Sequence, residues 1–261
     1  MKKFFNGIKF FSDDNAVIGL GGTASASSSS DDAVEAFNGS RDFGWISSGE
    51  NSDSTTSYIL RTFSASLYGD TIVIANHNLK PPFTVKINGT ALTNYDIQTA
   101  RNFTVVTFPY RDDITTIRIE ATKTMTPNEE KHIGEIMLLS TIGQFQQPQE
   151  LKNTLTREQG DLKLQNGKHF IFNCGQSWTF SIDVFSLSQQ DIDLLNALQS
   201  MGTPFHMWPC GGDETQFKYR FRPFLFNDFF KVSFSGNGKP NLKDNFYWTG
   251  LRDSVKLVEV E

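Results

Sequence analysis

Residues 83–89 read Phe-Thr-Val-Lys-Ile-Asn-Gly, and this stretch decides the fold class. Apolar residues alternate with polar ones at Phe83, Val85 and Ile87, which is the two-residue period of a half-buried β-strand. The Asn88-Gly89 pair that follows favours a tight hairpin turn, because both residues accept a positive φ. The stretch therefore predicts one strand of an antiparallel sheet that ends in a tight turn.

Similar short strand patterns lie on both sides of this stretch and are separated by regular turn signals. They are Tyr58 to Leu60, Thr71 to Ala75, Phe103 to Phe108, Ile114 to Ile119 and Ile133 to Leu139. Short strands at such spacing are typical of a β-sandwich or barrel. No segment before residue 187 has a convincing helical period, so we expect the first half to be mainly β.

The composition agrees with a β-rich protein and excludes some partners. The chain has 261 residues, including 24 Phe, and a net charge of −5. This length suggests two domains. A mildly acidic chain is not attracted to phosphate backbones, so nucleic acid is not an expected partner.

The first residues, Met-Lys-Lys-Phe-Phe-Asn-Gly, resemble a signal peptide only superficially. Asn6, Gly7 and Lys9 interrupt the apolar run, so a signal-peptide core is missing. No stretch approaches the roughly 18 apolar residues of a membrane span. We therefore expect a protein made in the cytoplasm without a signal peptide and without membrane insertion.

A change in composition divides the chain. Residues 143–168 are rich in Gln, Asn and Lys and have few apolar positions, so we expect a linker between a domain at 1–142 and a domain at 169–261. The second domain has strand patterns on both sides of one helix, which indicates an α+β arrangement. Its expected strands are Phe180 to Val184, Phe217 to Arg222, Phe230 to Phe234 and Val255 to Val260.

The helix is expected at about residues 188–201. Ser188 is a suitable N-cap, Asp191 occupies the third helical position, and Gly202 is a suitable C-terminal stop. Leu187 can pack on Ile192 across this N-terminus. The apolar stripe of the helix consists of Ile192, Leu194, Leu195, Leu198 and Met201.

Three motifs in the first half resemble a known family. Ala24 to Ser28 (ASASS), Ala33 to Gly39 (AVEAFNG) and Trp45 to Ser48 (WISS) are similar to the opening of a discoidin module, the galactose-binding-like domain also called coagulation-factor C-type. The resemblance covers roughly residues 8–140. It implies a jelly-roll β-sandwich that binds glycans, phospholipid head groups or proteins at loops on one end.

The resemblance also bears on calcium and on Trp45. Members of the family often hold a structural calcium near the Ala-Phe-Asp-Gly loop, but Asn38 stands here in place of the Asp, which removes one anionic ligand. Asp42 or backbone carbonyls could compensate, so calcium stays open while no cofactor is expected. Trp45 is either a ring that stacks on sugar or part of the core, and the family pattern favours the core.

The second half resembles ring-forming phage tail proteins in its layout, over Trp178 to Trp208 and over the closing stretch Phe246 to Val260. The resemblance implies a non-enzymatic structural component of a phage tail or baseplate, located in the virion. We expect a homo-oligomeric ring formed through the aromatic-rich C-terminal half, with other tail proteins as partners and the sandwich displayed toward a host-surface glycan. The alternative is a stand-alone carbohydrate-binding or adhesion module.

Motifs that carry chemistry are missing from the sequence. None of the four histidines, His77, His132, His169 and His206, has metal-binding spacing, although His206 with Cys210 leaves a two-ligand site as an alternative. The acidic pairs Asp112-Asp113, Glu129-Glu130 and Asp191/Asp193 are expected in solvated turns and at a helix N-terminus. We therefore expect no enzyme and assign no catalytic, cofactor-binding or metal-binding residue.

Two further features have open interpretations. Cys174 and Cys210 are expected to be free thiols, with one disulfide as the alternative. Lys218, Arg220 and Arg222 form a cationic strand face, which either contacts an acidic partner or protects a sheet edge against unwanted strand pairing.

Overall fold

The computed structural model divides the chain into two compact units. One is Asp14–Thr141, and the other combines Met1–Asp13 with Ile142–Glu261. Both are built on antiparallel sheets, which confirms the mainly β fold class. The structure describes residues 4–5, 7–12, 21–41, 43–93, 96–100, 102–146, 149–163, 169–184, 188–209, 229–235 and 253–260.

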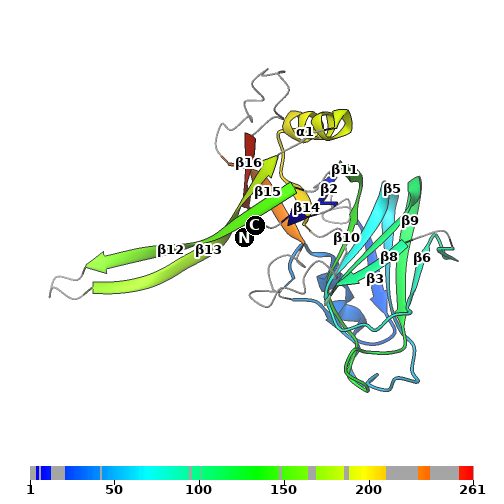
Figure 1. The fold of residues 1–261 in the computed structure, drawn as a ribbon. Coiled ribbons are helices and arrows are strands. Elements are labelled where there is room, and N and C mark those ends of the chain that lie inside the picture. The colour runs from blue at the N-terminus through cyan, green and yellow to red at the C-terminus, as the bar shows by residue number, and fades with distance from the viewer. Residues whose placement is uncertain are drawn as a thin grey trace. The chain divides into compact units, whose positions relative to one another are not determined.

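The first unit is a β-sandwich with one short 3₁₀ segment, η1, that the sequence did not predict (Figure 1). Its elements are β3 (Gly22–Ala26), η1 (Ser30–Phe37), β4 (Trp45–Ile46), β5 (Ser57–His77), β6 (Thr84–Ile87), β7 (Thr90–Ala91), β8 (Asp96–Ala100), β9 (Phe103–Ala121) and β10 (His132–Leu139).

Strands β5 and β9 run through both layers of the sandwich. They pair first at 57–62 with 116–121 and again at 71–74 with 104–107, with an irregular register between the two stretches. β3 and β6 extend the first stretch, while β10 and β8 extend the second. The sequence predicted four short strands here, and the structure joins them into two long ones, because a bulge bends a strand without ending its pairing.

The core of the sandwich comes from the inward-facing residues of both layers. Ile59 and Ile117 on one layer and Ile72 and Ile136 on the other are all essentially inaccessible to solvent. The hairpin predicted after residue 87 is confirmed, since β6 pairs with β7 and Asn88 and Gly89 have φ values of 51° and 77°.

In the described part of the second unit, eight strands form a sheet in the order β1-β12-β13-β16-β15-β14-β2-β11. The strands are β1 (Phe4–Phe5), β2 (Lys9–Ser12), β11 (Thr141–Gln144), β12 (Gln149–Lys163), β13 (His169–Val184), β14 (Phe205–Trp208), β15 (Phe230–Phe234) and β16 (Asp253–Glu259). The helix α1 (Gln189–Met201) contributes Leu194, Leu195 and Leu198 to the core of this unit.

The predicted helix and its caps are confirmed. Ser188 accepts a hydrogen bond from the Asp191 amide at 3.2 Å, and the Asp191 carboxylate accepts one from the Ser188 amide at 3.1 Å. Gly202 ends the helix in the left-handed region at φ 64°. The Asp191 carboxylate is buried and also accepts a hydrogen bond from the Gln146 amide at 2.7 Å, so it links the helix to the residues that follow β11.

The expected domain boundary at residue 1 needs correction. Residues 1–13 belong to the second unit, because β2 pairs with β14 and places Phe10 in the second core. The Phe10 ring lies 5.5 Å from that of Phe145 and 5.8 Å from that of Phe205. The second unit is therefore discontinuous in sequence, and the sandwich begins after residue 13.

The expected linker at 143–168 also needs correction. β12 occupies residues 149–163 and pairs with β13 along fourteen positions from Glu150↔Asp183 to Lys163↔His169. Its polar composition suggested a linker because sequence-based strand prediction relies on apolar alternation. Main-chain hydrogen bonds form this ribbon whatever the side chains are.

Several sequence-based predictions lie outside the described residues. These are the strand at 217–222 with its cations Lys218, Arg220 and Arg222, the contact of Leu187 with Ile192, and the state of Cys210. Among the residues that the structure describes, no helix is both long and apolar enough to cross a membrane.

Candidate ligand-binding surface

Residues 44–47 lie along the start of β10 and the residue before it. Trp45 and Ile46 of β4 pair with Ile133 and His132, and the Ser47 amide donates to the Lys131 carbonyl at 2.9 Å. Gly44 lies so close to this strand that an added Cβ would meet the Ile133 carbonyl oxygen at 2.1 Å. The main chain that follows Phe43 is therefore held closely against the sheet.

Arg41 is the centre of a polar cluster at this place. Its Nε lies 3.4 Å from a carboxylate oxygen of Glu135, whose side chain is only 6 % exposed. The guanidinium lies 5.2 Å from the centre of the Phe103 ring, and the Arg41 carbonyl accepts a hydrogen bond from Asn76 Nδ2 at 2.9 Å. Asn102 donates to the Asn76 side-chain oxygen at 3.3 Å. We call Arg41, Asn76, Asn102 and Glu135 the Arg41 cluster.

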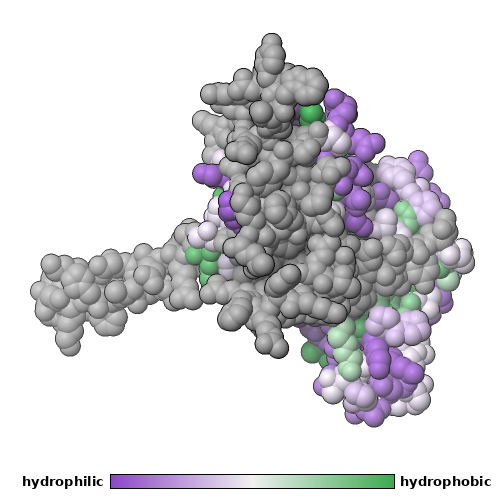
Figure 2. Space-filling view, viewed as in Figure 1, coloured by the Kyte–Doolittle hydropathy of each residue, from purple (hydrophilic) through white to green (hydrophobic). Residues whose placement is uncertain are grey.

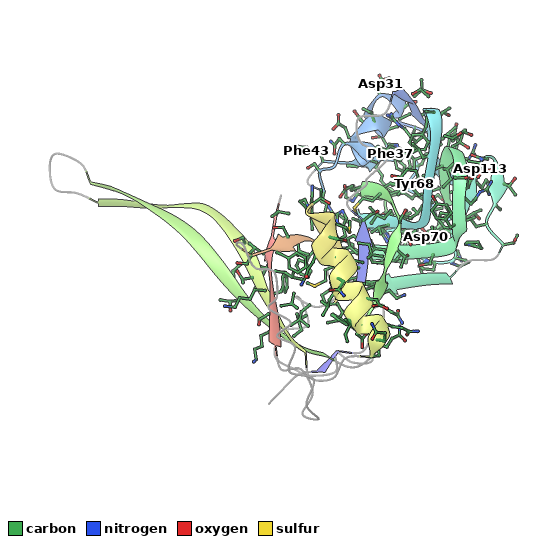
Figure 3. The ribbon with its side chains drawn as sticks, turned by 90° about the horizontal axis from the view of Figure 1, so that it is seen from above. Asp31, Phe37, Phe43, Tyr68, Asp70 and Asp113 are labelled. Atoms are coloured by element: carbon green, nitrogen blue, oxygen red, sulfur yellow. The ribbon has the colours of Figure 1, made fainter. Side chains whose placement is uncertain are left out.

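Phe43 stands two positions after Arg41 in the sequence. Its side chain is the most exposed of the large apolar side chains in the described part of the chain, at 71 % (Figure 3). Two neighbouring elements also carry exposed apolar residues, Val34 in η1 and Ile46 in β4. The visible surface of the sandwich unit is otherwise a mixture of hydrophilic and hydrophobic residues (Figure 2). Sequence reasoning missed Arg41 and Phe43, because neither stands in a recognisable motif.

Two further exposed rings belong to β5 and β9, near the place where the pairing of these strands is irregular. Tyr68 and Tyr110 are 46 % and 61 % exposed. Close to them in the chain, Arg111 makes two hydrogen bonds with Asp113, at 2.8 and 2.7 Å. The side-chain hydrogen bond and charge of Arg111 hold the pKa of the Asp113 carboxyl below its ordinary value.

Trp45 belongs to the core, as the family pattern favoured. Its side chain is 1 % exposed, and its indole nitrogen donates to the Ser28 carbonyl at 2.8 Å. The alternative interpretation, an exposed ring that stacks on sugar, is therefore wrong for this residue.

The loop at which the resemblance left a structural calcium open has hydrogen bonds among its own residues. Asn38 donates to the Glu35 carboxylate at 2.6 Å and accepts a hydrogen bond from the Ser40 amide at 2.7 Å. Asp42 lies outside the described residues. In the described part of the chain, no group of three or more His, Cys, Asp or Glu side chains could hold a metal ion.

His77 of the sandwich has structural partners for both ring nitrogens. His77 is buried, its Nδ1 accepts from the Leu79 amide at 3.0 Å, and its Nε2 lies 2.9 Å from the Thr104 hydroxyl. Because Nδ1 accepts, Nε2 carries the proton and donates to Thr104. Burial, together with the charge of His132, lowers the pKa of His77 to about 4.

His206, one half of the two-ligand alternative, is also buried, and its ring stacks against that of Phe229 at 5.1 Å. Cys210, the other half, lies outside the described residues. Cys174 lies within β13, where it interrupts the pairing register between Glu158↔Gly175 and Gln159↔Asn173.

Lys131 is a functional candidate that the sequence did not single out. It is 0 % exposed, and its ammonium donates to the carbonyls of Glu50 and Ser52 at 2.8 and 2.9 Å. Its amide donates to the Ser47 hydroxyl at 2.7 Å. In sequence, a lysine after two glutamates looks like an ordinary surface cation, so no local signal could have revealed this role.

Two solved structures of a carbohydrate-binding module are similar to the chain. They are chitosan-binding module 1 derived from a chitosanase/glucanase of Paenibacillus sp. IK-5 and a selenomethionine-labelled mutant of the same module. The match to the module itself covers 46 % of this chain and 95 % of the module, at 20 % identity and a TM-score of 0.35. The match to the mutant covers 46 % of this chain and 96 % of the mutant module, at 18 % identity and a TM-score of 0.34. No protein-family model and no curated protein matches the chain.

Proposed function

We propose that this chain is a non-catalytic glycan-binding protein and that residues 14–141 bind carbohydrate at the surface formed by Phe43 and the Arg41 cluster. The observation that carries the proposal is the exposure of Phe43 on a closely fastened main chain. An apolar ring that is 71 % exposed gains nothing for the fold of the sandwich. Because the main chain beside the ring is already ordered, a ligand that packs on the ring has only the Phe43 side chain to immobilise.

The chemistry of the surface suits a sugar. A pyranose has one face of C–H groups, which packs on an aromatic ring, and an edge of hydroxyls, which need donors and acceptors. Arg41 and the Asn76 and Asn102 amides supply both kinds of group. The Arg41 side chain is one-third exposed, so ligand oxygens can reach it while Glu135 holds it from below.

The test is a glycan array probed with the full chain, followed by calorimetric titration of the best ligand. We expect Phe43→Ala to weaken binding at least about tenfold, which corresponds to about 1.4 kcal/mol. Tyr110→Ala is the matched control, because its ring is similarly exposed and lies on a different part of the sandwich. An array without any bound glycan, or an equal loss in both variants, would refute the proposal.

The non-catalytic part of the proposal has its own measurement. Purified protein incubated with the glycans that it binds should release no reducing ends. Turnover that disappears on a single carboxylate substitution would show an enzyme instead.

A second candidate function is the structural role in a phage tail or baseplate, and the β12–β13 ribbon favours it. β16 pairs with β13 only at 179–184, and β1 pairs with β12 only at Gln149 and Glu150. Among the described residues, the outer half of the ribbon therefore pairs with no third strand, and it extends away from its sheet (Figure 1). A free strand edge suits strand addition by a neighbouring subunit.

The experiment for this role is a reconstruction of a particle that contains the chain. The role requires ring contacts from the unit that includes residues 142–261 and an outward-facing sandwich. Ring contacts made by the sandwich instead would count against it.

A further inference from the structure

We infer that Lys131 is a positioning residue for the Phe43 surface, because its buried ammonium acts as an internal cation that fixes the segment from Phe43 to Asp53. The inference rests on the proposed function for its effect on binding. Its effect on the segment itself stands on the geometry alone.

The charge of Lys131 lies inside the sandwich unit. Lys131 is completely inaccessible to solvent, and a buried ammonium is costly unless it is hydrogen-bonded. Its two bonds, to the Glu50 and Ser52 carbonyls, have the short lengths of charge-assisted hydrogen bonds, 2.8 and 2.9 Å. These acceptors are main-chain atoms of one loop, so the charge can be satisfied only while that loop keeps its conformation.

Further hydrogen bonds hold the same loop. Gly49 donates its amide to the Glu130 carboxylate at 2.7 Å, and the Glu50 carboxylate accepts from the Ser27 hydroxyl at 2.6 Å. Asp53 accepts from the amides of Thr124 and Asn128 at 3.3 and 3.2 Å. Partial desolvation acts to raise the pKa of Asp53, but these hydrogen bonds and the Lys131 charge lower it below its ordinary value.

Ser47 and β4 connect this loop to the exposed Phe43 ring. Ser47 forms hydrogen bonds with both the amide and the carbonyl of Lys131. β4 immediately precedes Ser47 in the chain. Gly44 then packs against β10, and Phe43, the next residue toward the N-terminus, carries the most exposed apolar side chain of this segment. Without the lysine charge, the loop carbonyls lose their donors and the segment opens from its C-terminal end toward Phe43.

The test compares Lys131→Met, which keeps the length of the side chain but removes its charge, with Lys123→Met, an exposed lysine on the adjoining loop. Hydrogen exchange of the backbone amides between Phe43 and Asp53 should accelerate by about tenfold or more in Lys131→Met and stay unchanged in Lys123→Met. Ser47→Ala is the milder variant to use if Lys131→Met does not fold. Unchanged exchange in this segment would overturn the inference.

The binding arm separates positioning from general stability. Ile87→Ala removes a buried side chain of the other layer and serves as a destabilised control. Lys131→Met should bind glycan at least about tenfold more weakly than Ile87→Ala at a temperature where both are folded. Equal affinities would overturn the positioning role. If the wild-type chain binds no glycan, the proposed function fails, and the exchange measurement alone decides the role of Lys131.

Discussion

The Arg41 guanidinium and the Glu135 carboxylate form an ion pair in which Nε lies 3.4 Å from Oε2, although 94 positions separate the two residues in sequence. The carboxylate is nearly buried, and the guanidinium is the cation that lies beside it. The pair joins the loop that carries Phe43 to the central part of β10.

Arg41→Met should therefore destabilise the sandwich by about 1–3 kcal/mol, because it leaves a buried carboxylate without its cation. The measurement is urea unfolding followed by circular dichroism. Arg111→Met is the matched control, since Arg111 pairs with an Asp113 carboxylate that is 59 % exposed. Exposed pairs contribute little, so the control should stay close to wild type. A similar loss in both variants would contradict this account.

Calcium binding is tested by thermal unfolding in chelator and in millimolar calcium. We expect no calcium-dependent rise in Tm, because Asn38 bonds to its own loop and Arg41 already supplies positive charge to Glu135. A ligand that binds only the folded state raises Tm. An increase of several degrees with calcium but not with magnesium would show that a calcium site exists.

His77 should make the stability of the sandwich depend on pH. Its pKa is about 4 in the folded chain and 6.5 in the unfolded chain, so only the unfolded chain takes up a proton between these values. The free energy of unfolding should fall by up to about 3 kcal/mol as the pH decreases from 6.5 to 4, and this group should cause little change at pH values well above 6.5.

The comparison for this prediction is His77→Gln, which has no group that titrates in that range. Urea unfolding at several pH values should give a shallower slope for the variant. The same slope in both proteins would mean that His77 does not cause the effect.

Strand β2, near the N-terminus, should stabilise the second unit and not the sandwich. Phe10→Ala removes a buried ring and should cost the second unit about 3–5 kcal/mol. Phe43→Ala, which truncates an exposed ring, should cost almost nothing. Hydrogen exchange distinguishes the two units, and faster exchange in the sandwich strands of Phe10→Ala would contradict the assignment.

The same assignment predicts which fragments fold. Residues 14–141 should form a soluble, cooperatively unfolding protein, because the first core is complete within this range. Residues 142–261 without 1–13 should fold poorly, since β14 loses its β2 neighbour and the core loses Phe10. A stable, monomeric 142–261 fragment would show that β2 is dispensable.

The sequence by itself determined the features that depend on neighbouring residues. The Asn88-Gly89 turn, the Ser188–Asp191 cap and the Gly202 stop follow from local backbone preferences, and the alternating strands follow from a two-residue period. Only the tertiary structure decided that β2 completes the second sheet, that residues 149–163 form a ribbon, and that Arg41 meets Glu135. The physical reason is that main-chain pairing and the burial of a charge depend on residues far away in sequence. Lys131 shows this most clearly, since an ordinary lysine becomes a buried cation only when the Glu50 and Ser52 carbonyls, roughly 80 residues earlier, are brought to it.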